Sequence, residues 1–235
     1  MIKEGIAVIG STTIDQIILR HGRTLKVGGV TVYSGMTYSR HGVNTLAITN
    51  IADGNPQVID CLRSQRILVH NGQTQKTTCF INDIRADDRR QRNPQRAAPI
   101  IRQQVIDHVK NAAYVHLGPL HPKDIDIGAI KSVRAFDSEV ILDIQGLVRA
   151  VKNGNVVPAV SAQITDALSV SHIVKANKSE YEVMINFFQT DLATLMRRYD
   201  VREFIVTEGA RGGFVQVIDA PVVRYAAVAA TSRGD

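Results

Sequence analysis

The sequence predicts an α/β fold, with a mainly parallel central sheet flanked by helices and a small β-sheet that forms a lid. From Tyr114 onward, short apolar runs alternate with helical patterns, which is typical of a parallel sheet covered on both faces. The residues before it contain extra β-like pieces that do not fit this alternation. Hydrophobic residues make up 44% of the chain and aromatic residues only 5%, so the core is largely aliphatic, as parallel sheets prefer.

The N-terminal segments are predicted to supply one core strand and the first part of the lid. Residues 5–10 form an apolar run bounded by glycine, which is typical of a buried strand. Residues 17–20 and 24–27 are two β-like pieces joined through His21-Gly22-Arg23, which predicts a hairpin. A helix over residues 33–41, closed by Gly42, and a strand over 45–51 follow.

A second hairpin is predicted over residues 66–81, because Asn71-Gly72 favours a tight turn between the apolar runs 66–70 and 76–81. The length of 235 residues suits one domain, so we expect a single α/β domain over 1–235 with lid pieces near 17–33 and 66–81.

The C-terminal half is predicted to build most of the parallel sheet. Asn177 is expected to cap the helix that follows one of its strands. The expected helices cover residues 101–112, 125–133 and a segment after 177, and the expected strands cover 114–117, 140–144, 173–175 and 204–207.

Charge and cysteine content narrow the class of protein. The formal charge of +6 favours anionic partners without choosing among them. The basic cluster is interpreted as a solvated loop, because it contains acidic residues and no aromatic ones, so nucleic acid is an unlikely partner. It comprises Arg85, Arg89, Arg90, Arg92 and Arg96.

Cys61 and Cys79 lack the spacing of zinc ligands, and no run of about 18 apolar residues exists to span a membrane. The N-terminal apolar run is too short for a signal peptide, so we expect a cytoplasmic protein.

Residues just after the predicted strands are the candidates for a binding site, because ligands of open α/β sheets bind beyond the carboxyl ends of the strands. Each of these segments is also explained by turn chemistry alone, and their joint order is the stronger signal. They are Gly10-Ser11, Gly118-Pro119, residues 143–146, Asn177 with Glu180, and residues 207–209.

In that order the segments resemble the PfkB/ribokinase family of carbohydrate kinases. Residues 7–15 are similar to its first strand, residues 27–29 to its glycine pair, and residues 143–149 to a D-x-Q-G-x-x-R pattern. Residues 177–180 match N-x-x-E, residues 207–212 match T-x-G-x-x-G, and residues 229–235 resemble D-x-T-G-x-G-D. The D-x-Q-G-x-x-R pattern and Arg233 most resemble the inositol kinase-like branch.

The resemblance implies an ATP- and magnesium-dependent kinase that phosphorylates a hydroxyl of a sugar or polyol such as an inositol. It implies that Asp235 is the general base, with Ser232, Arg233 and Gly234 forming an anion hole at a helix N-terminus. Substrate-binding residues are expected to be Asp15, Gly28, Gly29 and Arg149. Nucleotide-binding residues are expected to be Asn177, Glu180, Thr207, Gly209 and Gly212, with Glu180 also reaching magnesium through water.

Several alternatives stay open. Ala229 and Ser232 depart from the family pattern, and the family continues beyond this Asp, so we expect a chain that is incomplete at its C-terminus. Three alternative functions remain: a non-catalytic ligand-binding or regulatory protein with the same fold, a nucleoside kinase, and a nucleic-acid-binding protein. Lids of this kind can mediate dimers, so a homodimer through the lid is a further candidate.

Overall fold

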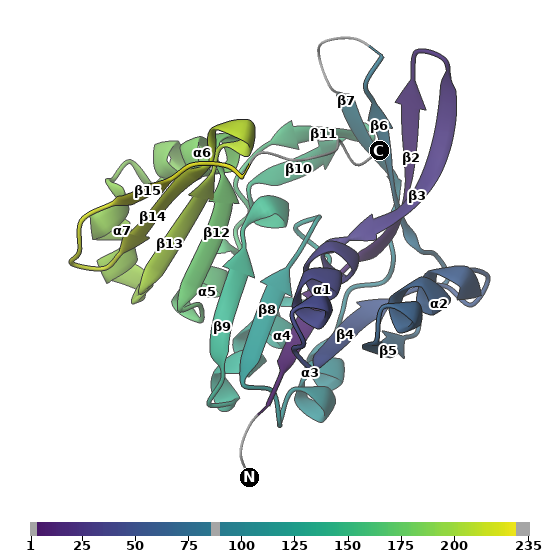
Figure 1. The fold of residues 1–235 in the computed structure, drawn as a ribbon, viewed down its shortest axis with the longest axis horizontal. Helices are drawn as coiled ribbons and strands as arrows, with labels where there is room; N and C mark the ends of the chain where they lie inside the picture. The colour runs from purple at the N-terminus through teal and green to yellow at the C-terminus, as the bar shows by residue number, and fades with distance from the viewer. Residues whose placement is uncertain (1–3, 86–89, 229–235) are drawn as a thin grey trace.

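The structure, a computed structural model, describes residues 4–85 and 90–228. A nine-stranded sheet forms its centre, in the order β15-β14-β13-β12-β9-β8-β1-β4-β5 (Figure 1). All neighbours from β5 to β13 run parallel, and β14 and β15 add an antiparallel edge. The strands are β1 (Ile6–Gly10), β4 (Thr45–Asn50), β5 (Ile67–Gly72), β8 (Tyr114–Gly118), β9 (Glu139–Asp143), β12 (Ile173–Asn177), β13 (Glu203–Thr207), β14 (Gly213–Val217) and β15 (Val223–Tyr225).

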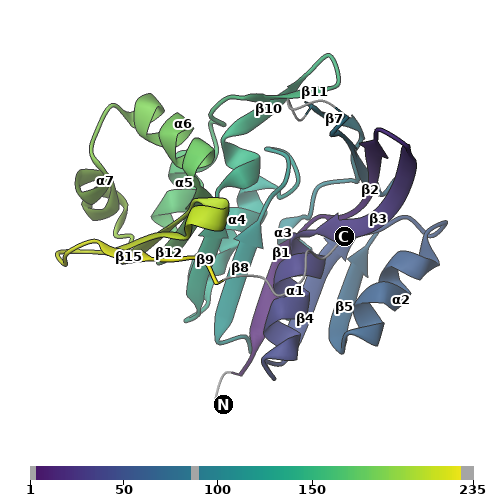
Figure 2. The same ribbon diagram turned by 45° about the horizontal axis from the view of Figure 1, so that its top comes forward.

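Helices pack on both faces of this sheet, as Figures 1 and 2 show. Helices α1 and α2 lie over the β1–β4–β5 side, around a small core that includes Val32, Val58 and Leu62. Helices α3 to α7 line the other face and enclose the larger aliphatic core. The helices are α1 (Val30–Arg40), α2 (Pro56–Ser64), α3 (Arg102–His108), α4 (Ile127–Ser132), α5 (Ile164–Ser169), α6 (Lys178–Phe188) and α7 (Leu192–Tyr199), with short 3-10 turns η1 (Val133–Ala135), η2 (Gln145–Leu147) and η3 (Gly209–Arg211).

A second sheet of six strands arches over the carboxyl ends of the central strands (Figure 2). Its order is β10-β11-β7-β6-β2-β3, and only β2 and β6 pair in parallel. These strands are β2 (Thr12–Leu19), β3 (Gly22–Gly29), β6 (Thr78–Asp83), β7 (Arg90–Gln95), β10 (Arg149–Lys152) and β11 (Asn155–Pro158). The predicted α/β fold with a small additional sheet is therefore confirmed, and the β2–β3 hairpin forms as expected.

The predicted hairpin over residues 66–81 was wrong, because its two halves belong to different sheets. β5 pairs with β4 in the central sheet, where Ile67 is buried in the small core. β6 pairs with β2 and β7 in the small sheet. Asn71 does not sit in a turn, since its side chain accepts from the backbone N–H of Ile51 and donates to the Ile51 carbonyl. That bridge ties the ends of β4 and β5 together.

Three further expectations needed correction. Residues 90–95 of the basic cluster form β7 rather than a loop. Helix α1 starts at Val30, three residues earlier than predicted, because Gly29 adopts φ +95° and turns the chain directly into the helix. The apolar residues Met184, Phe187 and Phe188 of the helix after Asn177 also predict core positions, but Phe187 is 55% exposed and lies outside the core that Met184 joins. None of the helices in the described part of the chain combines the length and apolar character needed to span a bilayer.

Candidate active site

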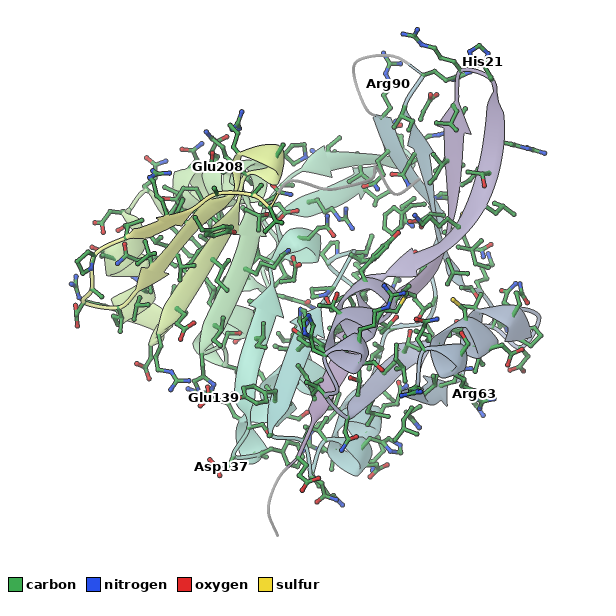
Figure 3. The ribbon with its side chains drawn as sticks, in the orientation of Figure 1. His21, Arg63, Arg90, Asp137, Glu139 and Glu208 are labelled. Atoms are coloured by element: carbon green, nitrogen blue, oxygen red, sulfur yellow. The ribbon has the colours of Figure 1, made fainter. Side chains whose placement is uncertain are left out.

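A cavity of about 650 Å³ lies where the carboxyl ends of the central strands face the small sheet. Its walls come from β2, β6 and β7 of the small sheet, from helix α1, from the segment after β8, from the end of β9, and from β12. Figure 3 labels residues remote from this cavity: His21 and Arg90 lie at the outer tip of the small sheet, and Asp137 and Glu139 lie at the amino-terminal edge of the large one. The cavity thus lies at the carboxyl edge of the central sheet, where the sequence predicted a binding site.

Asp15 enters the cavity from β2, and the neighbouring strand leaves space for its carboxylate. Gly28 on β3 lies beside it, so a Cβ at position 28 would stand 2.9 Å from the Asp15 Oδ2 atom and 3.0 Å from the Thr13 hydroxyl. A glycine at this position therefore lets the carboxylate lie close against the backbone. Asp15 and Gly28, two of the predicted substrate-binding residues, thus lie in contact with each other.

Gly29 is required by the backbone at the point where β3 becomes helix α1. Its φ of +95° is unfavourable for other residues, and a Cβ there would stand 2.2 Å from the Ser11 carbonyl oxygen. This turn brings one face of α1 against the cavity, including Tyr33 and Tyr38. Gly29 is itself part of the cavity wall, and its predicted role in substrate binding stays a prediction.

Arg149, the first residue of β10, joins the small sheet to the segment after β8. Its guanidinium donates to the Leu120 carbonyl and to Gln91 Oε1 on β7, the latter at 3.1 Å, and lies 5.0 Å from the centre of the Phe80 ring. The sequence left open a solvated helix face for this residue. Instead it is a half-buried strand residue that holds Leu120 and Gln91, both of which line the cavity.

The floor of the cavity is fixed by the buried carboxylate of Asp124. Its Oδ2 atom accepts from the backbone N–H groups of Leu120 and His121, both at 2.9 Å. Burial raises the pKa of this carboxyl, and the hydrogen bonds act against that rise.

Gly146 lets the turn after β9 pack closely against the segment after β8, because a Cβ there would stand 2.4 Å from the Pro119 carbonyl oxygen. The glycine of the D-x-Q-G pattern is therefore needed for a close approach of backbones.

Asp143, at the end of β9, and Lys175, in the middle of β12, form an ion pair in the cavity wall. The Lys175 Nζ atom lies 2.7 Å from the Asp143 Oδ2 atom. Burial alone would lower the Lys175 pKa, but the Asp143 carboxylate outweighs it, so the pKa is raised. The ammonium group is therefore charged at neutral pH, and the pair places a fixed cation where the two sheets meet.

His116 lies beneath this wall, in the middle of β8, with only 3% of its surface exposed. Its Nδ1 atom is 3.0 Å from the hydroxyl oxygen of Tyr38. Burial lowers the His116 pKa to about 4, with Lys175 acting in the same direction and Asp143 against it. No Cys or Ser nucleophile pairs with His116 in the sequence, which predicts a structural role, and the buried ring is neutral at physiological pH.

We expect the free energy of unfolding to fall between about pH 6.5 and pH 4 because of His116. The unfolded chain takes up a proton near pH 6.5 that the native state accepts only near pH 4, so this stability is present above 6.5 and lost as the pH falls. The loss is on the order of 3 kcal/mol. Urea titrations at several pH values would measure it.

His116→Asn should flatten that pH dependence, whereas His41→Asn, at an exposed position after α1, should leave it unchanged. An equally steep profile in the His116 variant would contradict this prediction.

Asn177 and Glu180 form the reciprocal cap of helix α6, as the sequence predicted. The Asn177 Oδ1 atom accepts from the Glu180 N–H at 3.0 Å, and the Glu180 Oε2 atom accepts from the Asn177 N–H at 2.8 Å. Burial raises the Glu180 pKa, against the hydrogen bond from Asn177 and the charges of Lys175 and Arg149. Thr207 pairs with Asn177 across β12 and β13. These residues lie beside the Lys175 end of the cavity rather than in its wall.

The predicted glycines of the T-x-G-x-x-G segment form the turn after β13. Gly209 and Gly212 have φ values of +61° and +86°, and a Cβ at Gly212 would stand 2.0 Å from the Tyr225 carbonyl oxygen. Both glycines therefore serve a tight turn on the same side of the sheet as Thr207. The predicted catalytic residues lie outside the described residues: Ser232, Arg233, Gly234 and Asp235.

Sequence reasoning missed several residues of the cavity wall. Lys175 gave no signal, because successive side chains of a strand point to opposite faces and a lysine between the buried Val174 and Ala176 fits ordinary alternation. Tyr38 lies in a predicted helix, but the sequence of that helix does not indicate which of its faces lines the cavity. Asn82 and Gln91 gave no signal, since their strands are polar and pair only in the folded chain.

Comparison with known proteins gives matches to solved structures only, since no family model and no curated sequence matches this chain. A pyrophosphate-dependent kinase in the ribokinase family, solved with a pyrophosphate analogue and myo-inositol, aligns with a TM-score of 0.81 and 22% identity over 94% of this chain and 78% of that one. A nucleoside kinase of Methanocaldococcus jannaschii gives 0.72 and 16%, over 100% and 80%. A ribokinase of Thermotoga maritima gives 0.69 and 14%, over 97% and 79%.

Proposed function

We propose that this chain, which has the ribokinase-like fold, is a kinase that transfers a phosphoryl group to a hydroxyl of a sugar or polyol. The observation that carries the proposal is the Asp15 carboxylate, held close over Gly28 inside a cavity at the carboxyl edge of the sheet. An ionised carboxylate has two acceptor oxygens and can take hydrogen bonds from two neighbouring hydroxyls of one molecule. That is the recognition a polyhydroxylated acceptor needs.

The chemistry of the cavity wall favours a polyol over an apolar acceptor. Carboxylate, amide and hydroxyl groups reach it from three elements, through Asp15 on β2, Asn82 on β6 and Ser34 on α1. The Gln91 amide donates to the Asn82 Oδ1 atom at 2.8 Å, so the two amides are fixed relative to each other. A volume of about 650 Å³ is within the range of small-molecule sites. A sugar or an inositol meets these conditions, and a nucleoside is the second class to test.

The phosphate donor is placed beside Lys175, on the side of Asn177 and Thr207. Three features support this: the charged ammonium of Lys175, the polar ends of β12 and β13, and the glycine turn at Gly209 and Gly212. We expected ATP from the sequence. One similar structure is of a pyrophosphate-dependent kinase, so pyrophosphate is the second donor to test.

Magnesium fits this arrangement only as an ion bound chiefly by donor oxygens and water. Among residues 4–85 and 90–228, no three His, Cys, Asp or Glu side chains gather closely enough to hold a metal. Mg²⁺ commonly keeps several waters besides the phosphates, so we assign the Glu180 carboxylate to it through one of these waters. When bound, the ion would neutralise charge on the phosphates.

We assign the general base to Asp235, on the sequence motif alone. A hydroxyl attacks poorly while it keeps its proton, and a carboxylate within hydrogen-bond reach can accept that proton during transfer. The backbone of Ser232, Arg233 and Gly234 would then donate to the transferring phosphoryl group. A cytoplasmic location and a homodimer through the small sheet also stay predictions.

The test is a phosphoryl-transfer assay with ATP or pyrophosphate, magnesium, and a panel of sugars, inositols and nucleosides. We expect turnover of at least one sugar or polyol, with the phosphomonoester product identified by mass spectrometry. Turnover of nucleosides alone would move the assignment to a nucleoside kinase. Tight polyol binding without any transfer, measured by thermal shift, would instead support a non-catalytic binding protein.

Gly28→Ala is expected to raise the KM for the acceptor about 10-fold. The added methyl group would stand 2.9 Å from the Asp15 Oδ2 atom, so the carboxylate must move away from its place over the backbone. The methyl group would also stand 3.0 Å from the hydroxyl of the buried Thr13, so the melting temperature should fall modestly. Gly54→Ala is the matched control, since no atom lies within 4 Å of a Cβ there. An unchanged KM in the Gly28 variant would contradict the assignment of Asp15.

A further inference from the structure

Tyr38 and His116 form a contact between the cavity wall and the buried core that the proposed function does not yet use. Tyr38 belongs to helix α1 and lines the cavity, whereas His116 belongs to β8 and is buried beneath it. The two rings meet edge to face, with centroids 5.9 Å apart and an angle of 71° between their planes. Their polar atoms are 3.0 Å apart, a hydrogen-bond distance at which either group could donate.

The other ring nitrogen of His116 decides which group donates. His116 Nε2 is buried and has no hydrogen-bond partner among the described residues. A buried N–H without a partner is rarer and more costly than a buried acceptor without one. The neutral ring therefore carries its proton on Nδ1 and leaves Nε2 as the unprotonated nitrogen. In this tautomer Nδ1–H donates to the Tyr38 oxygen.

This direction leaves the Tyr38 hydroxyl proton available to another group. A phenol oxygen that accepts from His116 can still donate its own proton. Its neighbours in the cavity wall include the Asp143–Lys175 pair, in which the Asp143 Oδ2 atom already accepts a hydrogen bond from the Lys175 ammonium group. The phenol is thus a fixed donor beside a fixed cation.

We propose that Tyr38 donates a hydrogen bond to an oxygen of the acceptor molecule, and that His116 is the positioning residue that holds the phenol in this direction. The inference rests on the proposed function, and it adds a specificity-determining contact from helix α1 to the one that Asp15 makes from β2. Asp15 accepts hydrogen bonds from acceptor hydroxyls, and Tyr38 gives one to an acceptor oxygen. An acceptor that lacks an oxygen at this place should bind less well.

Tyr38→Phe tests the contact itself. Loss of one hydrogen bond to the acceptor should raise both the Kd and the KM for that molecule about 5- to 10-fold, with kcat within about twofold of the wild-type value. Calorimetry without a phosphate donor gives the Kd, and initial rates give KM and kcat. Tyr114→Phe is the control, since Tyr114 lies at the amino end of β8, away from the cavity. Unchanged affinity in the Tyr38 variant would overturn the proposal.

His116 is tested by two substitutions that differ in one group. An asparagine amide can place an N–H near the position of Nδ1, so His116→Asn should keep the wild-type acceptor affinity. His116→Leu cannot donate and should raise the acceptor Kd as Tyr38→Phe does. In the double variant Tyr38→Phe, His116→Leu the two effects should not add. Additive effects, or equal losses in the Asn and Leu variants, would show that His116 acts only on packing.

The same data separate this inference from the proposed function. If no sugar or polyol binds or reacts with the wild-type protein, the proposed function fails before Tyr38 is considered. If the wild-type protein binds a polyol and the Tyr38→Phe variant binds it equally well, only the inference fails. Should the Leu variant not fold, the Asn variant and Tyr38→Phe still decide between the outcomes.

Discussion

Asp235→Asn is expected to lower kcat about 10³-fold while the acceptor still binds. An asparagine side chain has nearly the same shape as aspartate but cannot take up the proton of the attacking hydroxyl. General base catalysis by a positioned carboxylate contributes about 10²- to 10⁴-fold, so the loss should fall in that range. The acceptor Kd, measured by calorimetry without a donor, should stay within about twofold, because the assignment gives Asp235 a role in transfer rather than in binding.

Asp219→Asn provides the control for this variant. Its carboxylate pairs with Arg197 on the surface, at 2.7 Å, and has no place in the cavity wall. This variant should keep wild-type kcat and KM. Full activity of the Asp235 variant would show that Asp235 is not the general base, and the sequence motif would then give no evidence of a catalytic role.

Asp15→Asn is expected to reduce kcat/KM about 10²- to 10³-fold, mainly through a higher KM for the acceptor. Two charge-assisted hydrogen bonds from acceptor hydroxyls are each worth about 1.5–3 kcal/mol. Asparagine keeps one acceptor oxygen and replaces the other with an NH₂ group, which cannot accept. The position of Asp15 beside Gly28 makes this loss local, so the fold should be preserved.

The measurement is a comparison of initial rates over a range of acceptor concentrations, at saturating donor. The KM for the donor should be unchanged, because Asp15 lies on the small sheet and the proposed donor site lies beside Lys175. Asp53→Asn, in the turn before α2, is the control with the same chemical change. If the Asp15 variant lost donor binding and kept acceptor binding, the assignment of Asp15 to the acceptor would be wrong.

The part of the site that the sequence predicted depends on local backbone chemistry. Gly28 and Gly29 stand out because a strand with two adjacent glycines is unusual, and the structure uses one for space and the other for a positive φ. The Asn177–Glu180 cap is also local, since both partners lie within one helical turn. After Tyr114, strands β8, β9, β12 and β13 and helices α4 and α6 were predictable for the same reason, because each apolar run reports its own burial. Strands β10, β11, β14 and β15 and helices α5 and α7 were not predicted.

The rest depends on contacts between distant segments. Residues 90–95 have no strand pattern of their own and become β7 only by pairing with β6 and β11. Asn71 looked like a turn residue, but its amide bridges to Ile51 twenty positions away. The hydrogen bond between Tyr38 and His116 joins residues 78 positions apart, and no single-sequence pattern reports it.

The most direct test of the central claim is a crystal structure of the protein with magnesium, a non-hydrolysable donor and the acceptor selected by the transfer assay. We expect the acceptor to lie in the cavity with two hydroxyls on the Asp15 carboxylate, and the terminal phosphate of the donor to lie between Lys175 and Asp235. An acceptor bound elsewhere, or a donor phosphate remote from Asp235, would contradict it.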